Sequence, residues 1–334
     1  MINLTEDEIT KNWKDENILV SINTLTYNHE KYIAQCIEGI LMQKTNFAFE
    51  LLIHDDASTD NTAAIIKEYE KKYPKIIKPI YQTENQWSKG IKIAATYQYP
   101  RAKGKYIAFC EGDDYWIDEN KLQMQVDVLE ANPEATICYC RVQTFEGQVD
   151  KHTIPLDKSI TEGFVNLKDF TTEEFKNGHW TFHTSSFFIR KEILIDFANK
   201  DNEKFGTFPY GDMPVQLFAL CKGKGFFIDK IMSKYRLFSG GYNSFVLAHP
   251  EKRINDEKKL IQALTKFDEF SEFKYHEDIE CKIKRSHFFI SKQSRDKKYA
   301  KQFISKKEYI SIFYPTIYKI LRKIKKLFNK FFKK

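Results

Sequence analysis

Short apolar runs alternate with stretches of helical periodicity from residue 17 onward. The run at 18–22 predicts a buried strand. Asn28 is the predicted cap of a helix whose apolar positions between Tyr32 and Leu41 form one stripe. Further strands are predicted at 50–54, 76–81, 106–110 and 136–142, and further helices at 61–73 and 121–131. Strands that alternate with helices are typical of a mainly parallel, doubly wound sheet, so the chain is predicted to be an α/β protein.

The pattern changes after residue 142. Residues 143–180 are polar and irregular, which predicts loops and short helices. A strand at 184–190, a helix at 213–221 and a short strand at 225–229 are predicted to follow. From about residue 251 the chain is predicted to be helical, and it is rich in basic residues. We therefore expect an N-terminal extension (1–16), an α/β domain (17–250) and a helical C-terminal region (251–334).

Two predicted strands end in closely spaced carboxylates. One apolar run leads into Glu-Gly-Asp-Asp at 111–114, and another leads into Asp55 and Asp56. Carboxylates this close repel one another unless a cation lies among them. Mg²⁺ takes one or two carboxylates and fills its other positions with water and phosphate oxygens. Because ligands bind at the carboxyl ends of parallel strands, the two motifs predict one metal-diphosphate site. A solvated acidic turn is the alternative for either motif alone.

Composition indicates a globular protein, with 42% hydrophobic and 30% charged residues. The net charge of +7 is unevenly distributed, since the last twenty residues hold eight Lys and Arg and no acid. The six cysteines form no CxxC pair, which favours a reduced, cytosolic setting without disulfides. No signal peptide is predicted, because residues 1–8 show neither a basic n-region nor an apolar h-region. No transmembrane helix is predicted, because no stretch of about 18 uncharged apolar residues occurs.

Four motifs in this order resemble the glycosyltransferases of family 2. They are Val20-Ser21-Ile22 with Thr26-Tyr27-Asn28, the segment 55–62, the segment 102–107 running into 111–114, and Tyr210-Gly211-Asp212-Met213. The resemblance covers roughly residues 17–245. It implies the GT-A fold, a Rossmann-like α/β sandwich that binds a nucleotide-sugar at its strand ends, here followed by a basic helical extension.

The resemblance implies a set of donor-binding residues. Thr26 and Tyr27 would lie against the nucleobase, and Asp56 would accept the N–H of uracil. A helix cap or Asx turn is the alternative for Asp56. Lys89 would face the phosphates, with a solvated surface lysine as its alternative. Asp113 would lie near the ribose or the metal.

The resemblance also implies a metal and a catalytic base. Asp114 would coordinate Mg²⁺ or Mn²⁺ between the two phosphates, with Asp113 as a second metal residue. Asp212 would be the base that activates the acceptor hydroxyl, and a helix cap is its alternative.

The acceptor side is predicted from fewer residues. His183, Arg236 and Trp116 are candidates there, and a buried structural histidine is the alternative for His183. Phe238 stands where relatives often carry a histidine that helps to hold the metal or diphosphate. Water, another residue or Arg236 would have to take that place.

The C-terminal segment is a predicted basic amphipathic helix. Its apolar positions recur at helical spacing, and Lys and Arg fill the other face: Ile317, Ile320, Leu321, Ile324, Leu327, Phe328 and Phe331. Such a helix is typical of an anionic membrane surface. A helix packed on the catalytic domain is the alternative. Nucleic acid is disfavoured, because aromatic and basic residues lie on separate faces.

The leading hypothesis is an inverting, metal-dependent glycosyltransferase that uses a UDP-sugar. Its acceptor would be a glycan or a lipid-linked glycan in surface polysaccharide synthesis, on the cytoplasmic face of the membrane. Two alternatives stay open: a catalytically inactive, membrane-bound partner with the same fold, and a sugar nucleotidyltransferase. The second would carry a glycine-rich loop after the first strand, and residues 24–28 contain no glycine.

Overall fold

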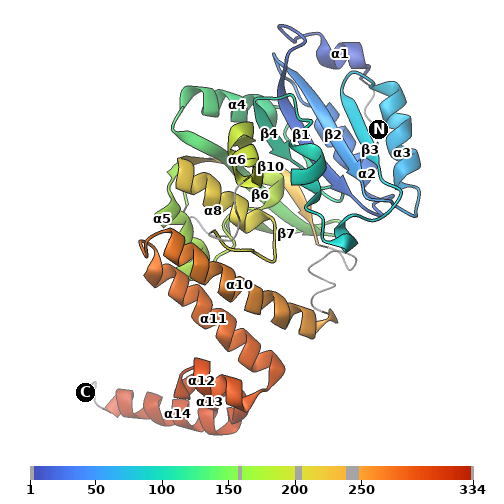
Figure 1. Cartoon of the computed structure of the whole chain (residues 1–334). Coiled ribbons are helices and arrows are strands. Elements are labelled where there is room, and N and C mark those ends of the chain that lie inside the picture. The colour runs from blue at the N-terminus through green and yellow to red at the C-terminus, as the bar shows by residue number, and fades with distance from the viewer. Residues whose placement is uncertain (1–3, 157–159, 200–204, 238–247, 332–334) are drawn as a thin grey trace. The chain divides into compact units, whose positions relative to one another are not determined.

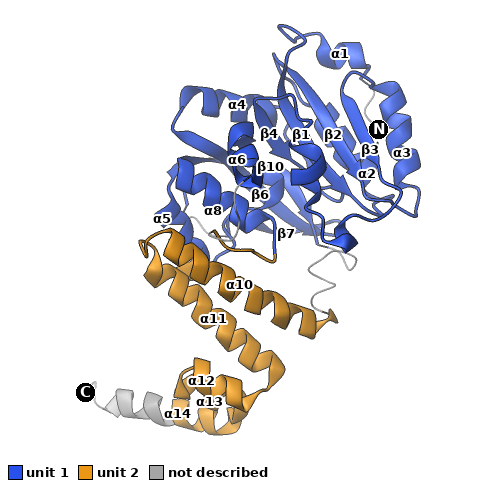
Figure 2. Cartoon of the chain, in the orientation of Figure 1, with its two compact units in different colours: residues 1–174, 179–200, 210–238 blue, residues 175–178, 201–209, 239–334 orange. Residues whose placement is uncertain are grey.

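A computed structural model describes residues 4–156, 160–199, 205–237 and 248–331. The chain forms two compact units, shown in Figure 2. Unit 1 comprises residues 1–174, 179–200 and 210–238, and unit 2 comprises residues 175–178, 201–209 and 239–334. The expected division at 17–250 and 251–334 remains a prediction.

Unit 1 is built on one sheet with strand order β3-β2-β1-β4-β9-β6-β10-β5, to which β7 adds on β6 and β8 on β10 (Figure 1). The strands are β1 Ile18–Thr26, β2 Ala48–Asp55, β3 Ile77–Tyr81, β4 Tyr106–Phe109, β5 Tyr115–Trp116, β6 Ala135–Glu146, β7 Val149–Ile154, β8 Gly163–Val165, β9 Phe188–Arg190 and β10 Lys224–Arg236. Strands β3, β2, β1 and β4 are parallel, as predicted. Strand β9 is antiparallel to both β4 and β6, so the whole sheet is mixed.

The helices of unit 1 include α1 Glu6–Thr10, α2 Ile33–Leu41, α3 Thr62–Lys72, α4 Lys121–Ala131, α5 Leu167–Phe170, α6 Lys191–Asn199 and α8 Asp212–Lys222. Most of these helices pack on the sheet, and α5 packs on α8. The stripe predicted for α2 is buried, with Cys36, Ile37 and Ile40 fully inaccessible. Helix α2 comes close to β5, because a Cβ at Gly39 would lie only 2.7 Å from the Trp116 carbonyl oxygen.

Three sequence expectations for unit 1 need correction. Asn28 does not cap α2, which begins after Tyr32. Asn28 has a φ of 56° and its Oδ1 accepts the Thr59 N–H at 2.8 Å, so it joins two loops instead. The polar segment 143–180 contains β7 and β8 as well as loops, and the last strand runs to Arg236, well beyond the predicted 225–229.

The main helices of unit 2 are α10 Pro250–Phe270, α11 His276–Ser294, α12 Lys297–Phe303, α13 Lys306–Phe313 and α14 Pro315–Phe331. Leu264, Phe267 and Ile279 are completely buried between α10 and α11. Ser305 and Glu308 form a capping box that starts α13. Within the described part of the chain, no helix combines the length and the apolar character that crossing a bilayer requires.

Candidate functional site

The two acidic motifs meet at the carboxyl ends of three neighbouring strands. In the sheet register Thr26 of β1 pairs with Asp55 of β2, and the Asp56 N–H donates to the Thr26 carbonyl at 3.0 Å. On the other side of β1, the Gly112 N–H donates to the Leu25 carbonyl at 2.9 Å. The segment 111–114, which we call the acidic turn, therefore lies directly against the end of β1.

Glycine is required in the acidic turn by its close contact with β1 and the loop that follows. A Cβ at Gly112 would lie 2.7 Å from Thr26 Oγ1 and 2.9 Å from His29 Nδ1. Both of these atoms are buried and have no hydrogen-bond partner in the described structure. Burial lowers the pKa of His29, while the charges of Asp113 and two other aspartates oppose that shift. Sequence reasoning missed His29, because only the folded register brings it beneath Gly112.

The carboxyl groups of the acidic turn are strongly perturbed. Burial, together with the charges of Asp113 and Asp212, raises the pKa of Glu111 to about 8. Asp114 is only 2% exposed, and burial and the neighbouring Asp113 raise its pKa well above the usual aspartate range. Carboxyls in this state either keep a proton or need a positive charge beside them.

Arg236, the last residue of β10, holds the acidic turn in place. Its backbone N–H donates to Asp114 Oδ1 at 3.0 Å, and its Nε–H donates to the Asp113 carbonyl at 3.0 Å. Its other guanidinium N–H donates to Gln35 at 2.7 Å, and the guanidinium lies 4.4 Å from the centre of the Tyr32 ring. Arg236 therefore reaches the predicted site, where its guanidinium already has protein partners. Phe238 lies outside the described residues.

His183 also lies beside Asp114, with 3.9 Å between His183 Nδ1 and Asp114 Oδ2. Burial lowers the pKa of His183 to about 3, so the ring is neutral near neutral pH. Its Nδ1 accepts the Ser185 N–H at 3.2 Å, which places the ring proton on Nε2. Trp116 is only 1% exposed and donates from Nε1 to the Ser185 carbonyl at 3.3 Å. Its indole belongs to the core and offers no surface to an acceptor.

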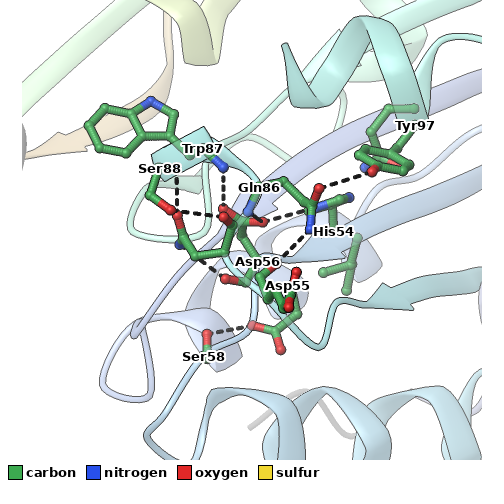
Figure 3. A network of polar contacts seen from close by, with 12 residues as sticks. His54, Asp55, Asp56, Ser58, Gln86, Trp87, Ser88 and Tyr97 are labelled. Carbon is green, nitrogen blue, oxygen red and sulfur yellow. Dashed lines mark hydrogen bonds and ion pairs between the residues drawn. The ribbon is translucent and has the colours of Figure 1, made fainter. Parts of the chain in front are cut away.

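Asp56 anchors the loop between β3 and β4, as Figure 3 shows. Its two carboxylate oxygens accept the N–H groups of Gln86 and Trp87 at 2.8 and 3.0 Å. His54 Nε2 lies 3.5 Å from the same carboxylate. Asp56 makes no capping bond to α3, whose first N–H, that of Thr62, is accepted by Asp60. Asp56 is therefore not the N-cap of α3.

The other predicted donor residues lie on the same loops. Tyr27 follows β1 directly and keeps 45% of its surface exposed. Lys89 ends the short 3₁₀ helix Trp87–Lys89 and is ion-paired with Glu84 at the surface. Trp87, whose backbone Asp56 holds, has a side chain that is 60% exposed. Two exposed aromatic side chains, Tyr27 and Trp87, therefore belong to the loops that Asp56 joins by hydrogen bonds.

Asp212 is the first residue of α8, after Gly211 at the cap position. Its Oδ1 accepts the N–H of the next residue, Met213, at 2.8 Å. Burial raises the pKa of Asp212, and its own charge contributes to the raised pKa of Glu111. Asp212 therefore lies near enough to Glu111 for its charge to act on that carboxyl group, although about 100 residues separate the two in the sequence.

The donor set suits a hard divalent cation that is shared with a ligand. Among the described residues, no three His, Cys, Asp or Glu side chains come together to hold a metal ion by themselves. Asp113 and Asp114 supply two adjacent carboxylates, which is the number that Mg²⁺ uses when phosphate oxygens complete its shell.

An α/β sheet with carboxylates gathered at the ends of parallel strands defines a ligand-binding site of the nucleotide-binding α/β class. The family model described as Glycosyl transferase family 2 matches residues 21–197. The match covers more than half of the chain, and the protein belongs to this family. The predicted resemblance is confirmed.

Curated relatives match the part of the chain that carries the site. An uncharacterized protein of Mycobacterium bovis is 40% identical over 141 residues, which are 41% of this chain and 39% of that protein. The Escherichia coli UDP-Glc:alpha-D-GlcNAc-diphosphoundecaprenol beta-1,3-glucosyltransferase WfgD is 36% identical over 117 residues, 35% of this chain and 43% of the relative. The chain thus spans about two fifths of the length of these relatives.

Solved structures share the fold over most of the chain. S. aureus TarS 1-349 in complex with UDP-GlcNAc has a TM-score of 0.54 at 16% identity, covering 90% of this chain and 88% of that one. The mannosyltransferase PcManGT of Pyrobaculum calidifontis, in complex with GDP-Man and Mn2+, has a TM-score of 0.51 at 16% identity, covering 97% and 94%. These likenesses confirm the predicted GT-A fold.

Proposed function

We propose that this protein is an inverting, metal-dependent glycosyltransferase that moves a sugar from a UDP-sugar to a hydroxyl of a glycan or lipid-linked glycan. The observation that carries the proposal is the acidic turn at the end of β1, together with the charge of Asp212 that acts on Glu111 of this turn. This arrangement offers a place for a cation with a diphosphate and a separate carboxylate to act on an acceptor. Two related proteins whose names include a UDP-sugar, WfgD and TarS, support the choice of donor.

Asp113 and Asp114 would hold Mg²⁺ or Mn²⁺. The cation supplies positive charge that offsets the charge on the departing diphosphate. Asp113 is half-buried, whereas one oxygen of the buried Asp114 already accepts the Arg236 N–H. Arg236 and Asp114 together fix the turn, so Asp113 is held ready to face a ligand.

Thr26, Tyr27 and Asp56 would bind the nucleobase. Tyr27 has a free ring surface at the end of β1, which suits stacking on a base. A carboxylate has about four lone-pair sites, so Asp56 can accept a uracil N–H in addition to the two backbone N–H groups it holds. Lys89 would turn from Glu84 to the phosphates when a donor is bound.

Asp212 would act as the general base. It would take the proton of the acceptor hydroxyl while that oxygen attacks the anomeric carbon opposite the departing diphosphate. In-line attack of this kind inverts the anomeric centre. Only the ionised carboxylate can accept the proton. Because burial raises the pKa of Asp212, its carboxylate is a stronger base than an ordinary aspartate once it is ionised.

The acceptor is proposed to be lipid-linked, which would make placement at the membrane useful. WfgD, by its name, acts on a sugar carried by diphosphoundecaprenol. Three apolar residues of α14 support a membrane-facing helix here, because Ile317, Ile320 and Leu321 are 51%, 52% and 48% exposed. Residues 315–334 also hold eight Lys and Arg and no acid.

Removal of residues 315–334 tests the membrane placement. The shortened protein should lose binding to anionic vesicles at low salt, and it should lose activity on a lipid-linked acceptor. Its activity on a short soluble acceptor should change little. Equal vesicle binding by the full-length and shortened proteins would refute this placement.

A panel of nucleotide-sugars tests the proposed reaction. The purified protein is incubated with each donor and Mn²⁺, and release of the nucleoside diphosphate is measured with and without EDTA. We expect release from one or more UDP-sugars that EDTA abolishes. Donor binding without turnover on any acceptor would support a non-catalytic partner instead, and full activity in EDTA would contradict the metal assignment.

A further inference from the structure

Unit 2 contains a cavity of about 400 Å³ that the glycosyltransferase reaction does not use. It lies between α11, α13 and α14, and its lining includes Lys284, Arg285, Phe288, Lys307, Glu308, Ser311 and Tyr318. The cavity thus combines cationic side chains and hydroxyl groups with an aromatic ring. Such a lining is suited to a phosphate group attached to an apolar body.

The one acid in this lining is already engaged. Glu308 Oε2 accepts the backbone N–H and the hydroxyl of Ser305 at 2.9 and 2.6 Å, as the reciprocal half of the capping box. Lys284 pairs with Glu280 on its own helix at 2.9 Å. Lys307 is exposed and makes no ion pair among the described residues. The cavity therefore presents an uncompensated cation.

Hydrogen-bond donors stand beside this cation. The Tyr318 hydroxyl has no hydrogen-bond partner in the described part of the chain and lies on the wall that α14 provides. Ser311 donates its hydroxyl hydrogen to the Glu308 carbonyl at 2.7 Å, so this hydrogen is not available to a ligand in the cavity. Arg285 Nη2 donates to the carbonyl groups of Phe175 and Lys176. Lys307 and Tyr318 are thus the lining groups without such protein partners, and they can bind phosphate oxygens.

The cavity lies at the edge of the apolar stripe of α14. Tyr318 follows Ile317 and lies one turn from Leu321, and both of these neighbours are about half exposed. An amphipathic helix in a membrane interface buries such a stripe to the depth of the headgroups. Groups at the edge of the stripe then meet lipid phosphates.

The charge of this region fits an anionic surface. From Lys297 to Lys334 the sequence holds thirteen Lys and Arg and one acid, a net charge of +12. Since the whole chain carries +7, the remaining residues together carry −5. The attraction to an anionic leaflet is therefore concentrated in the segment that includes α13 and α14.

We propose that the cavity between α11, α13 and α14 binds the phosphate headgroup of an anionic lipid, through Lys307 and Tyr318. The proposal rests on the membrane association proposed above and adds to it a specific headgroup site. A phosphomonoester is the favoured headgroup, because its doubly charged, exposed oxygens can reach both an ammonium and a hydroxyl. General attraction to negative charge would show no such preference.

Vesicle binding by the full-length protein tests the site. One set of phosphatidylcholine vesicles contains phosphatidic acid, and a second contains phosphatidylserine at matched surface charge. The variants are Lys307→Gln and Tyr318→Phe, with Lys298→Gln as the matched control. Lys298 is an exposed lysine of α12 outside the cavity lining.

We expect tighter binding to the phosphatidic acid vesicles. Lys298→Gln should weaken binding to both vesicles by about fivefold, the effect of one cation near an anionic surface. Lys307→Gln should weaken binding to phosphatidic acid by roughly 30-fold or more, since it also loses a charge-assisted hydrogen bond. Tyr318→Phe should reduce the preference for phosphatidic acid without changing the charge.

Equal losses for Lys307→Gln and Lys298→Gln would overturn the proposal, as would equal binding of the two vesicle types by the wild type. Displacement from phosphatidic acid vesicles by millimolar inorganic phosphate at constant ionic strength would assign the cavity to free phosphate instead. UDP-sugar hydrolysis should be unchanged in the variants, so failure of the headgroup site is distinguishable from failure of the proposed reaction. Binding to neither vesicle would overturn both the membrane placement and this site.

Discussion

Glu111 gives the acidic turn a pH dependence that can be measured without a substrate. Its pKa is about 8 in the folded protein, against an ordinary value of 4.5. Between these values the folded protein binds the proton more tightly than the unfolded chain does. The stability that this proton provides is complete below about pH 4.5 and is lost as the pH rises through 8.

The size of the effect follows from the shift. A difference of about 3.5 units at 1.36 kcal/mol per unit corresponds to about 5 kcal/mol as an upper limit for one site. A domain of 150–250 residues changes its melting temperature by about 2–4 °C per kcal/mol. Glu111→Gln, which resembles the protonated side chain, should therefore melt up to roughly 10–20 °C above the wild type at pH 9 and close to it at pH 4.5.

The assay is thermal unfolding in EDTA between pH 4.5 and 9. The transition of unit 1 is identified as the one that UDP with Mn²⁺ shifts. Glu134→Gln is the matched control, because Glu134 is an exposed glutamate of the same unit, and its pH profile should follow the wild type. Mn²⁺ with UDP should reduce the difference between wild type and Glu111→Gln. Identical profiles for these two proteins in EDTA would refute the reasoning.

Three further predictions concern the proposed roles. Asp212→Asn should keep donor affinity and lower the single-turnover transfer rate by about 10²- to 10⁴-fold, and a normal rate in the variant would exclude the base role. The wild-type rate should rise with pH as Asp212 loses its proton. Asp113→Asn should weaken Mn²⁺-dependent UDP binding in calorimetry more than Asp114→Asn, because Asp113 is the more exposed carboxylate. Asp56→Ala should leave two backbone N–H groups of the loop after β3 without acceptors and speed their hydrogen exchange; unchanged protection would show that Asp56 does not hold this loop.

Apolar periodicity was sufficient to predict the elements that carry the site. The four strands β3, β2, β1 and β4 and the helix α4 occur where they were expected. Strands buried on both faces leave continuous apolar runs, and the acidic motifs stand where those runs end. The position of the site therefore follows from sequence, since parallel neighbours bring their carboxyl ends to one edge.

The parts that sequence did not predict depend on polar residues in buried positions. Strand β10 continues through Ser233, whose hydroxyl donates to Ser185 Oγ at 2.9 Å in the interior. A serine and two lysines within residues 230–234 interrupt the apolar pattern, so the pattern does not predict a strand there. His29 is a similar case, because its position beside Gly112 comes from contacts between distant segments. Arg236 was a predicted candidate, but its hydrogen bonds to Asp113 and Asp114 could not be predicted from the sequence.

Asp113 and Asp114 of the acidic turn differ in their contacts and in their burial, and this difference affects where a cation would bind. Asp114 is enclosed by the Arg236 N–H and by His183, which is neutral because burial lowers its pKa. A carboxylate so enclosed stabilises the turn and has few directions left for a ligand. Arg236 also holds the Asp113 carbonyl, so the Asp113 backbone is fixed while its side chain stays half-buried. The family resemblance implies Asp114 as the first metal ligand. From these contacts we propose that Asp113 is the leading ligand and that Asp114 shapes the turn around it.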